Sequence, residues 1–195
     1  MGNLGSVQNM FKYIGVKSQI SSDIKEIKAA EKLLLPGVGS FDAAMQRLND
    51  LGLSELLTQK VVQDKTPTLG ICLGMQLLTN GSDEGKLAGL GWIDAYTHKF
   101  ESEPGRKIPH MGWSQVHIKK ESLLSKSISE ESKFYFVHSY YVKVKDEENA
   151  MLTTKYGSTI FDSAIQNEHI FGAQFHPEKS HKHGMALLKS FADYQ

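Results

Sequence analysis

The chain has 195 residues, of which 40% are hydrophobic, and its 22 Lys and Arg residues balance its 22 Asp and Glu residues. This length and hydrophobic content predict a single globular domain over residues 1–195. A formal net charge of zero provides no broad positive field, so we expect neither nucleic acid nor an anionic membrane as a partner.

The chain contains one cysteine, Cys72, which excludes an internal disulfide and is typical of a reducing compartment. No apolar run approaches the ~20 residues of a membrane span, and the first residues lack the charged and apolar regions of a signal peptide. We therefore expect a cytoplasmic protein.

The first ninety residues predict helices that alternate with short apolar strands. Apolar residues at helical spacing, or a capping residue, predict helices at 7–14, 42–51 and 54–62, the last capped by Ser54. Unpatterned apolar runs predict strands at 16–20, 32–35 and 66–71. This alternation predicts a parallel sheet that is covered by helices on both faces.

The second half is rich in strand-like segments separated by turn residues. These segments are 107–119, 133–144, 150–156, 158–167 and 169–175. They predict antiparallel strands that extend the sheet, followed by a last helix near 182–193. The fold class is therefore α/β, an open mixed sheet with a mostly parallel core.

The start of the chain departs from the usual order of a doubly wound domain. Such a domain opens with a strand that leads into its first helix, whereas here the helix begins almost at Met1. We therefore expect the first strand of the fold to be absent from this sequence.

Cys72 lies in the segment "LGICLGMQL", between Gly70 and Gly74. G-x-C-x-G has the form of the G-x-S-x-G nucleophile elbow, a sharp turn from strand to helix that exposes its central side chain. A Cβ at either glycine would collide with the neighbouring strand or helix. The start of a helix also stabilises a thiolate. The alternative is a cysteine that serves only as a small core residue.

A base for this nucleophile is available in "QFHPEKS", where His176 ends an apolar strand and Glu178 follows two residues later. Open α/β sheets present their functional groups at strand ends. The pattern predicts that His176 exchanges a proton with the Cys72 thiol and that Glu178 orients the imidazole. Because 104 positions separate the cysteine from the histidine, only the fold can bring them together.

Acyl transfer also requires donors for the developing oxyanion. The segment "PGVGS" follows a predicted strand, and its glycines free the backbone to direct N–H groups into a pocket. The N–H groups of Val38 and Leu73 are the candidates. A dinucleotide-binding loop is the rival interpretation, but the residues after Gly39 break the G-x-G-x-x-G pattern.

Three other functions remain to be weighed. A metal site near His181 and His183 lacks a second cysteine ligand, so we expect no metal and no other cofactor. A cysteine hydrolase acting on peptides would show a groove for extended substrates. A catalytically silent binding module would require the pattern at Cys72, His176 and Glu178 to be coincidental.

Three motifs in one order, "LLLPGVGSF", "LGICLGMQLL" and "FGAQFHPEKS", resemble the class I (triad-type) glutamine amidotransferases. The segments "MGNLGSV", "IPHMGW" and "FYFVHSYYV" narrow the resemblance to the glutaminase subunits of imidazole glycerol phosphate synthases, over essentially the whole chain. The resemblance implies a flavodoxin-like fold and an enzyme of histidine biosynthesis. In it, Cys72 attacks L-glutamine, a glutamyl thioester forms, and glutamate and ammonia are released.

The resemblance also implies further site residues. Those matching positions that hold the amino-acid end of glutamine are Gly39, Gln76, Glu84, Ser139 and Tyr140. A Glu84 carboxylate suits an α-ammonium group, while hydroxyl and N–H groups suit the carboxylate. Without this role, Gln76 would be an ordinary residue on a helix surface, and Ser139 and Tyr140 strand residues facing water.

By the same resemblance, the partner is a cyclase subunit with a (β/α)₈ barrel, which forms a heterodimer with this chain and receives ammonia directly. The residues matching interface positions are Asn3, Pro109, Met111, Trp113 and Lys179. Ser114 stands where the family usually has Asn. Two segments, "GLGWIDA" and "HPEKSHKHG", also resemble paralogues that supply ammonia to the synthesis of modified surface sugars, so the ammonia acceptor stays open.

Overall fold

The computed structural model describes residues 4–195, and Asn3, one of the predicted partner contacts, lies outside them. The helices and helical turns are α1 (Leu4–Tyr13), α2 (Ile24–Ala29), α3 (Phe41–Asp50), α4 (Leu53–Thr58), η1 (Gln59–Gln63), α5 (Leu73–Leu77), η2 (Glu147–Asn149), η3 (Pro177–Lys179) and α6 (His181–Ala192). The strands are β1 (Leu33–Gly37), β2 (Thr68–Cys72), β3 (Ala95–Lys99), β4 (His110–Gln115), β5 (His117–Ile118), β6 (Lys133–His138), β7 (Tyr140–Val144), β8 (Ala150–Tyr156), β9 (Thr159–Asn167) and β10 (Ile170–Ala173).

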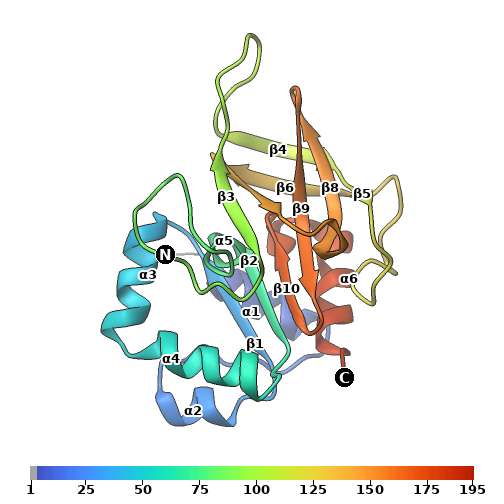
Figure 1. The fold of residues 1–195 in the computed structure, drawn as a ribbon. Coiled ribbons are helices and arrows are strands. Elements are labelled where there is room, and N and C mark those ends of the chain that lie inside the picture. Colours follow the sequence, from blue (N-terminus) through green and yellow to red (C-terminus); the bar gives the residue numbers. More distant parts are fainter. Residues whose placement is uncertain (1–3) are drawn as a thin grey trace.

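The main sheet of the described residues has six strands in the order β1-β2-β10-β9-β8-β5 (Figure 1). The pairs β1–β2 and β2–β10 are parallel, whereas β10–β9, β9–β8 and β8–β5 are antiparallel. Two antiparallel ribbons, β3–β7 and β4–β6, lie beside it. The predicted mixed sheet is confirmed, with β1, β2 and β10 as its parallel part.

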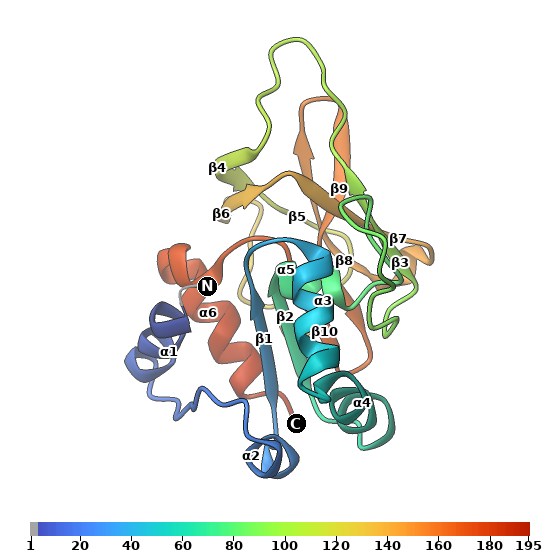
Figure 2. The ribbon, with the colours of Figure 1, turned by 90° about the vertical axis from the view of Figure 1, so that its left-hand side faces the viewer.

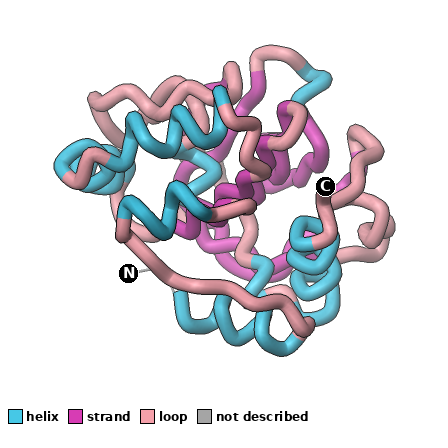
Figure 3. The backbone as a smooth tube through the Cα atoms, turned by 90° about the horizontal axis from the view of Figure 1, so that it is seen from below, coloured by secondary structure: helices cyan, strands magenta, loops and turns pink. Residues whose placement is uncertain are grey.

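Helices cover both faces of the parallel strands (Figures 2 and 3). On one face, Val7 and Phe11 of α1 and Leu188 of α6 belong to the same core cluster as Leu69 and Ile71 of β2. On the other face, α4 and α5 share a second cluster with β1 and β10. Burying both faces explains why these strands are apolar runs without alternation.

The strand predicted at 16–20 is wrong, because these residues form neither helix nor strand. The N–H of Val16 donates to the carbonyl of Phe11 and completes the end of α1, where Gly15 has a φ of 76°. A strand also needs a partner for its backbone groups. Within residues 4–195, β1 is the outermost strand on its side of the sheet and pairs with β2 alone.

The helix predicted at 54–62 differs from the observed structure in two ways. Helix α4 begins at Leu53 after Gly52, and the hydroxyl of Ser54 donates to the Asn49 side chain instead of capping the helix. After Thr58 the chain continues in the wider turn η1. Helix α2 was not predicted, although Asp23 caps it by accepting from the N–H groups of Lys25 and Glu26.

Candidate active site

Cys72 ends β2 and immediately precedes α5, with φ of 54° and ψ of −114°. A side chain other than glycine rarely adopts such a backbone, and strained positions of this kind gather at functional sites. The flanking glycines are required by contact distances. A Cβ on Gly70 would lie 2.6 Å from the carbonyl oxygen of Gly74, and one on Gly74 would lie 1.7 Å from that of Leu35. The predicted sharp turn at Cys72 is therefore confirmed, and its geometry permits only glycine at positions 70 and 74.

The strands on either side of β2 deliver the other predicted groups to the same sheet edge. Gly37 of β1 lies opposite Cys72, and Ala173 of β10 lies opposite Ile71. Since all three strands are parallel, their carboxyl ends meet at one edge. His176, which follows β10, therefore lies beside Cys72 despite the distance between them in sequence.

His176 and Glu178 form a buried pair. The imidazole Nδ1 lies 2.8 Å from Glu178 Oε1, and their side chains are 6% and 4% exposed. Burial alone would lower the pKa of His176, but the Cys72 thiol and the Glu178 carboxylate outweigh burial and raise it to about 9. The other ring nitrogen, Nε2, is buried without a well-aligned hydrogen bond. Such contacts between catalytic groups often tighten only when substrate binds.

The turn that carries the pair is held from both sides. The N–H of His176 donates to the Tyr135 carbonyl, and the Ser180 hydroxyl donates to the His176 carbonyl while accepting from the Tyr135 N–H. Behind it, a Cβ on Gly184 would lie 1.8 Å from the Pro177 carbonyl oxygen, so α6 approaches the turn closely. These contacts fix the imidazole relative to the sheet.

The predicted oxyanion donors lie at the same edge. Val38 follows Gly37, Leu73 follows Cys72, and the two preceding residues are neighbours across β1 and β2. Val38 is 42% exposed, whereas Leu73 is 3% exposed. Gly39 has a φ of 103°, a backbone conformation that favours glycine. The chain therefore leaves β1 in a turn beside the thiol.

The predicted substrate residues lie around the same edge. Gln76 is 4% exposed, so it is not an ordinary residue of a helix surface. Glu84 accepts from the N–H of Phe41 at 2.8 Å, at the start of α3. Burial raises the pKa of Tyr140, and the nearby Glu84 and Asp83 carboxylates raise it further. Ser139 is half-buried between β6 and β7.

Three polar residues of this region were not predicted. Gln174 is fully buried, and its side-chain nitrogen lies 3.7 Å from Cys72 Sγ. His110 and His138 are cross-strand neighbours on β4 and β6, and their rings are joined by a 3.0 Å hydrogen bond. All three occur inside motifs that the sequence analysis quoted. The available signal for Gln174 was a polar residue directly after the apolar strand β10 and two residues before His176.

Two of the predicted partner contacts are linked by an aromatic cluster. The Trp113 ring stacks on His181 at 5.4 Å and meets Tyr135 edge to face, while Lys179 Nζ lies 5.5 Å from the centre of the Tyr135 ring. Met111 and Trp113 are 62% and 47% exposed on the outward face of β4. Pro109 is exposed just before this strand.

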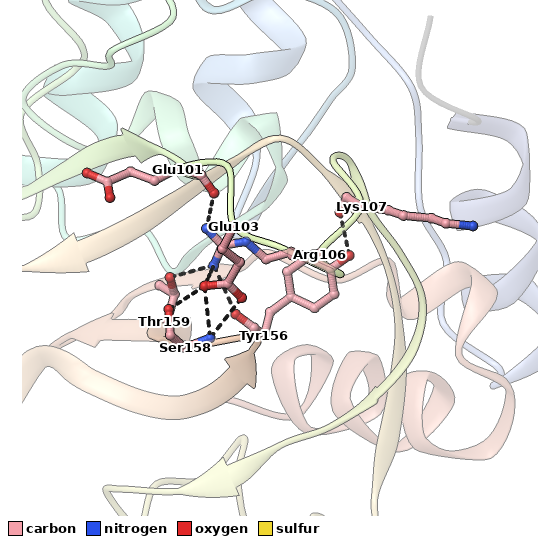
Figure 4. A network of polar contacts seen from close by, with 7 residues as sticks. All are labelled: Glu101, Glu103, Arg106, Lys107, Tyr156, Ser158 and Thr159. Atoms are coloured by element: carbon pink, nitrogen blue, oxygen red, sulfur yellow. Dashed lines mark hydrogen bonds and ion pairs between the residues drawn. The ribbon is translucent and has the colours of Figure 1, made fainter.

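The loop before Pro109 is attached to the β8–β9 turn (Figure 4). The guanidinium of Arg106, whose side chain is 3% exposed, donates to the Tyr156 carbonyl, to the Thr159 hydroxyl and to the Glu101 carbonyl. Glu103 accepts from Ser158. A pocket of about 510 Å³ lies beside this network and is lined by Gly105, Lys107, Ile108, Pro109, Met111 and Tyr156.

His181 and His183, at the start of α6, contact aromatic rings. His181 stacks on Trp113, and His183 lies 6.0 Å from the Phe134 ring. In the part of the chain that the structure describes, no three His, Cys, Asp or Glu side chains are placed to hold a metal ion. Nor does any helix of residues 4–195 have the length and apolar character to cross a membrane.

The amino-acid sequence is similar to those of known proteins. The pattern of the family described as "Glutamine amidotransferase class-I" matches residues 3–193. A protein of Methanococcus maripaludis named imidazole glycerol phosphate synthase subunit HisH 2 is 54% identical, over 98% of this chain and 94% of its own. A protein of the same name from Pseudomonas aeruginosa is 48% identical, over 99% of this chain and 95% of its own. A protein of Bdellovibrio bacteriovorus, named subunit HisH without a number, is 41% identical, over 99% of this chain and 96% of its own.

Solved structures show the same fold at low sequence identity. A protein of Thermoplasma acidophilum described as a putative GMP synthase component superimposes with a TM-score of 0.71 at 18% identity, covering 98% of this chain and 87% of that one. A structure of PurLQS from Thermotoga maritima gives a TM-score of 0.68 at 15% identity, with 99% and 93% covered.

Proposed function

Because the chain belongs to the class I glutamine amidotransferase family, we propose that it is the glutaminase subunit of an imidazole glycerol phosphate synthase, acting in histidine biosynthesis. The observation that carries the proposal is the meeting of three groups at one sheet edge. They are a cysteine on a strained elbow, a buried imidazole beside it and the carboxylate that holds the imidazole.

These residues support a thioester mechanism. With its raised pKa, the His176 imidazole holds the proton that the Cys72 sulfur gives up, and the sulfur attacks the carboxamide carbon of L-glutamine. The N–H groups of Val38 and Leu73 stabilise the oxyanion, where the loss of one such donor typically costs about 3 kcal/mol. The imidazolium then donates its proton to the leaving nitrogen, ammonia departs, and a glutamyl thioester remains on the sulfur.

Hydrolysis repeats the cycle with water as the nucleophile. His176 accepts a proton from the water, which attacks the thioester, and then returns a proton to the sulfur as glutamate leaves. Glu178 stabilises the imidazolium in both halves, as its short contact with Nδ1 supports. Gly39, Gln76, Glu84, Ser139 and Tyr140 hold the amino-acid end of glutamine, with the Glu84 carboxylate facing the α-ammonium.

The ammonia passes to a cyclase subunit, which we propose has a (β/α)₈ barrel fold and forms a heterodimer with this chain. Its docking surface includes Pro109, Met111, Trp113 and Lys179. Exposed aromatic and methionine side chains are typical of interface centres, and Lys179 lies over the Tyr135 ring that Trp113 also contacts. Free ammonia is protonated in water and loses its nucleophilicity, so a closed path between the subunits serves the reaction. We place the complex in the cytoplasm.

The test mixes the purified chain with the cyclase and measures glutamate release with and without the cyclase substrate. Glutamate release that rises with the cyclase substrate supports the proposal. Cys72→Ala should abolish product formation from glutamine while leaving product formation from added ammonia intact. An unchanged glutamine-dependent rate in Cys72→Ala would contradict a nucleophilic role for the sulfur.

A second candidate for the ammonia acceptor rests on the segments "GLGWIDA" and "HPEKSHKHG", which also resemble paralogues that supply ammonia to surface-sugar synthesis. Of eight relatives, the four named HisH 1 or HisH 2 are 48–54% identical to this chain, and the four named HisH without a number are 38–43% identical. The alternative is a protein that supplies ammonia to the synthesis of a modified surface sugar. Glutaminase activity that the histidine-pathway cyclase does not stimulate would favour this alternative.

A further inference from the structure

We propose that Gln174 is a positioning residue for the Cys72 nucleophile and that a chain of hydrogen bonds from β4 holds its amide in place. This inference rests on the proposed catalytic role of Cys72. Gln174 is fully buried, its Nε2 lies 3.7 Å from Cys72 Sγ, and its Oε1 accepts from Gln76 at 3.0 Å. An amide N–H facing sulfur stabilises negative charge there and limits where the sulfur can move.

The orientation of this amide follows from a backbone carbonyl. Gln76 Nε2 lies 3.3 Å from the carbonyl oxygen of Tyr140, which can only accept a hydrogen bond. The nitrogen of Gln76 therefore faces Tyr140, and its other hydrogen is given to Gln174. Gln174 must present its oxygen to Gln76, so its nitrogen is left to face the sulfur.

The same carbonyl anchors the two buried histidines. Tyr140 O also accepts from His138 Nδ1 at 2.7 Å. Burial lowers the pKa of His138 to about 3 and that of His110 to about 4, so both rings are neutral at pH 7. With Nδ1 of His138 protonated, its Nε2 must accept from His110 Nδ1, which lies 3.0 Å away.

The chain of hydrogen bonds ends on the strand that carries the proposed partner surface. Since His110 donates from Nδ1, its Nε2 accepts, and the Ser114 hydroxyl lies 2.8 Å from it. On β4, His110 and Ser114 face inward and alternate with the exposed Met111 and Trp113. One strand thus presents a docking surface outside, and inside it begins a series of hydrogen bonds that meets the Gln76–Gln174 pair at the Tyr140 carbonyl, which accepts from both sides.

The test is the alkylation of Cys72 by iodoacetamide in the isolated full-length chain, followed from pH 6 to 9. Because Cys72 is the only cysteine, the label reports this sulfur alone, and Cys72→Ser gives the blank. Gln174→Met keeps the length of the side chain but removes the donor. We expect alkylation to slow about tenfold at pH 7 and its rise with pH to move to higher pH.

A smaller effect, about threefold, is expected for His138→Phe, which acts through Tyr140. His169→Phe is the matched control, because His169 is also a buried histidine but binds the Val61 carbonyl outside the chain of hydrogen bonds. Its alkylation rate should equal that of the original protein, even where urea unfolding shows lower stability.

Two outcomes overturn the inference. One is an unchanged alkylation profile in Gln174→Met, and the other is a His169→Phe variant that slows alkylation as much as His138→Phe. The assay uses neither glutamine nor a cyclase, so its failure is distinct from failure of the proposed function. Conversely, a chain without glutaminase activity could still show the expected alkylation pattern.

Discussion

His176 and Glu178 make a 2.8 Å contact although only one residue separates them, with Pro177 at the start of the turn η3 between them. The turn directs both side chains into the protein, so the carboxylate meets the imidazole away from water. Water would weaken this ion pair, and burial preserves its strength.

Replacement of Glu178 by Gln tests this contact. The amide keeps the shape of the side chain but removes the negative charge that stabilises the imidazolium. We expect kcat for glutamine hydrolysis to fall about 100-fold with little change in KM. Steady-state glutamate release in the complex measures it. Lys179→Gln is the control, because Lys179 is the next residue but lies outside the pair. At a saturating concentration of cyclase, its hydrolysis rate should stay within a few fold of that of the original protein. Equal losses of rate in the two variants would contradict the orienting role of Glu178.

The raised pKa of His176 predicts a dependence of stability on pH. Its pKa rises from 6.5 to about 9 on folding, so the folded state binds the proton more tightly. The stabilisation is fully present below pH 6.5 and is lost as pH rises toward 9. The free energy of unfolding of the original protein, minus that of His176→Gln, should decrease by up to about 3 kcal/mol across this window. Urea unfolding at pH 6 and pH 9.5 checks it, and a constant difference would contradict the pKa shift.

The two histidines of β4 and β6 predict the opposite behaviour in acid. Burial lowers the pKa of His110 to about 4 and that of His138 to about 3, whereas the unfolded chain protonates both below pH 6.5. Stability is therefore present above pH 6.5 and is lost as pH falls toward 4. At pH 5 the loss should be about 2 kcal/mol for each histidine. When both histidines are replaced by Phe, the free energy of unfolding, measured with urea, should fall less between pH 6.5 and pH 4. His117→Gln, at an exposed position on β5, should not change this dependence on pH.

Gly74→Ala tests the steric requirement of the elbow. The new Cβ would meet the Leu35 carbonyl oxygen at 1.7 Å, and both are parts of rigid elements. We expect a loss of about 3 kcal/mol in the free energy of unfolding. Gly15→Ala is the control, since its Cβ meets nothing within 4 Å and only its φ of 76° is strained. A cost there of about 1 kcal/mol is expected, and equal costs at the two sites would show that contact with β1 is unimportant.

Trp113→Ala tests the proposed docking surface. The Trp113 ring is 47% exposed in the isolated chain and stacks on His181, so a partner can cover it without a rearrangement of β4. We expect affinity for the cyclase to fall about 30-fold, the effect of a central interface aromatic. Calorimetric titration measures it. Tyr13→Ala removes an aromatic side chain that is 79% exposed at the end of α1 and should leave the affinity unchanged.

The loop that leads to this surface is held by Arg106, and Figure 4 shows the polar contacts of Arg106 and of the next residue. Its guanidinium lies within the network, whereas the side chain of the next residue, Lys107, points away from it, although the Lys107 carbonyl accepts from the Tyr156 hydroxyl. The position of Pro109 and Met111 therefore depends on contacts with a turn about fifty residues further along the chain.

Local sequence determined the parts of this protein that depend on short-range sterics and chemistry. The two glycines around Cys72, and the order of His176, Pro177 and Glu178, predicted a sharp elbow and a carboxylate that orients the imidazole, because such geometry is set by a few neighbouring residues. Strand positions such as 32–35 followed from apolar runs that could only be buried on both faces. The family resemblance rested on the same short motifs.

Tertiary structure alone decided which distant groups meet. Residues 16–20 form no strand, since a strand exists only by pairing and none of the described strands pairs with them. The orientation of Gln174 depends on the Tyr140 carbonyl, and that carbonyl is also bound by His138 from the adjoining end of β6. Hydrogen bonds of this kind join residues far apart in the chain, so their direction is settled only when the strands are packed together.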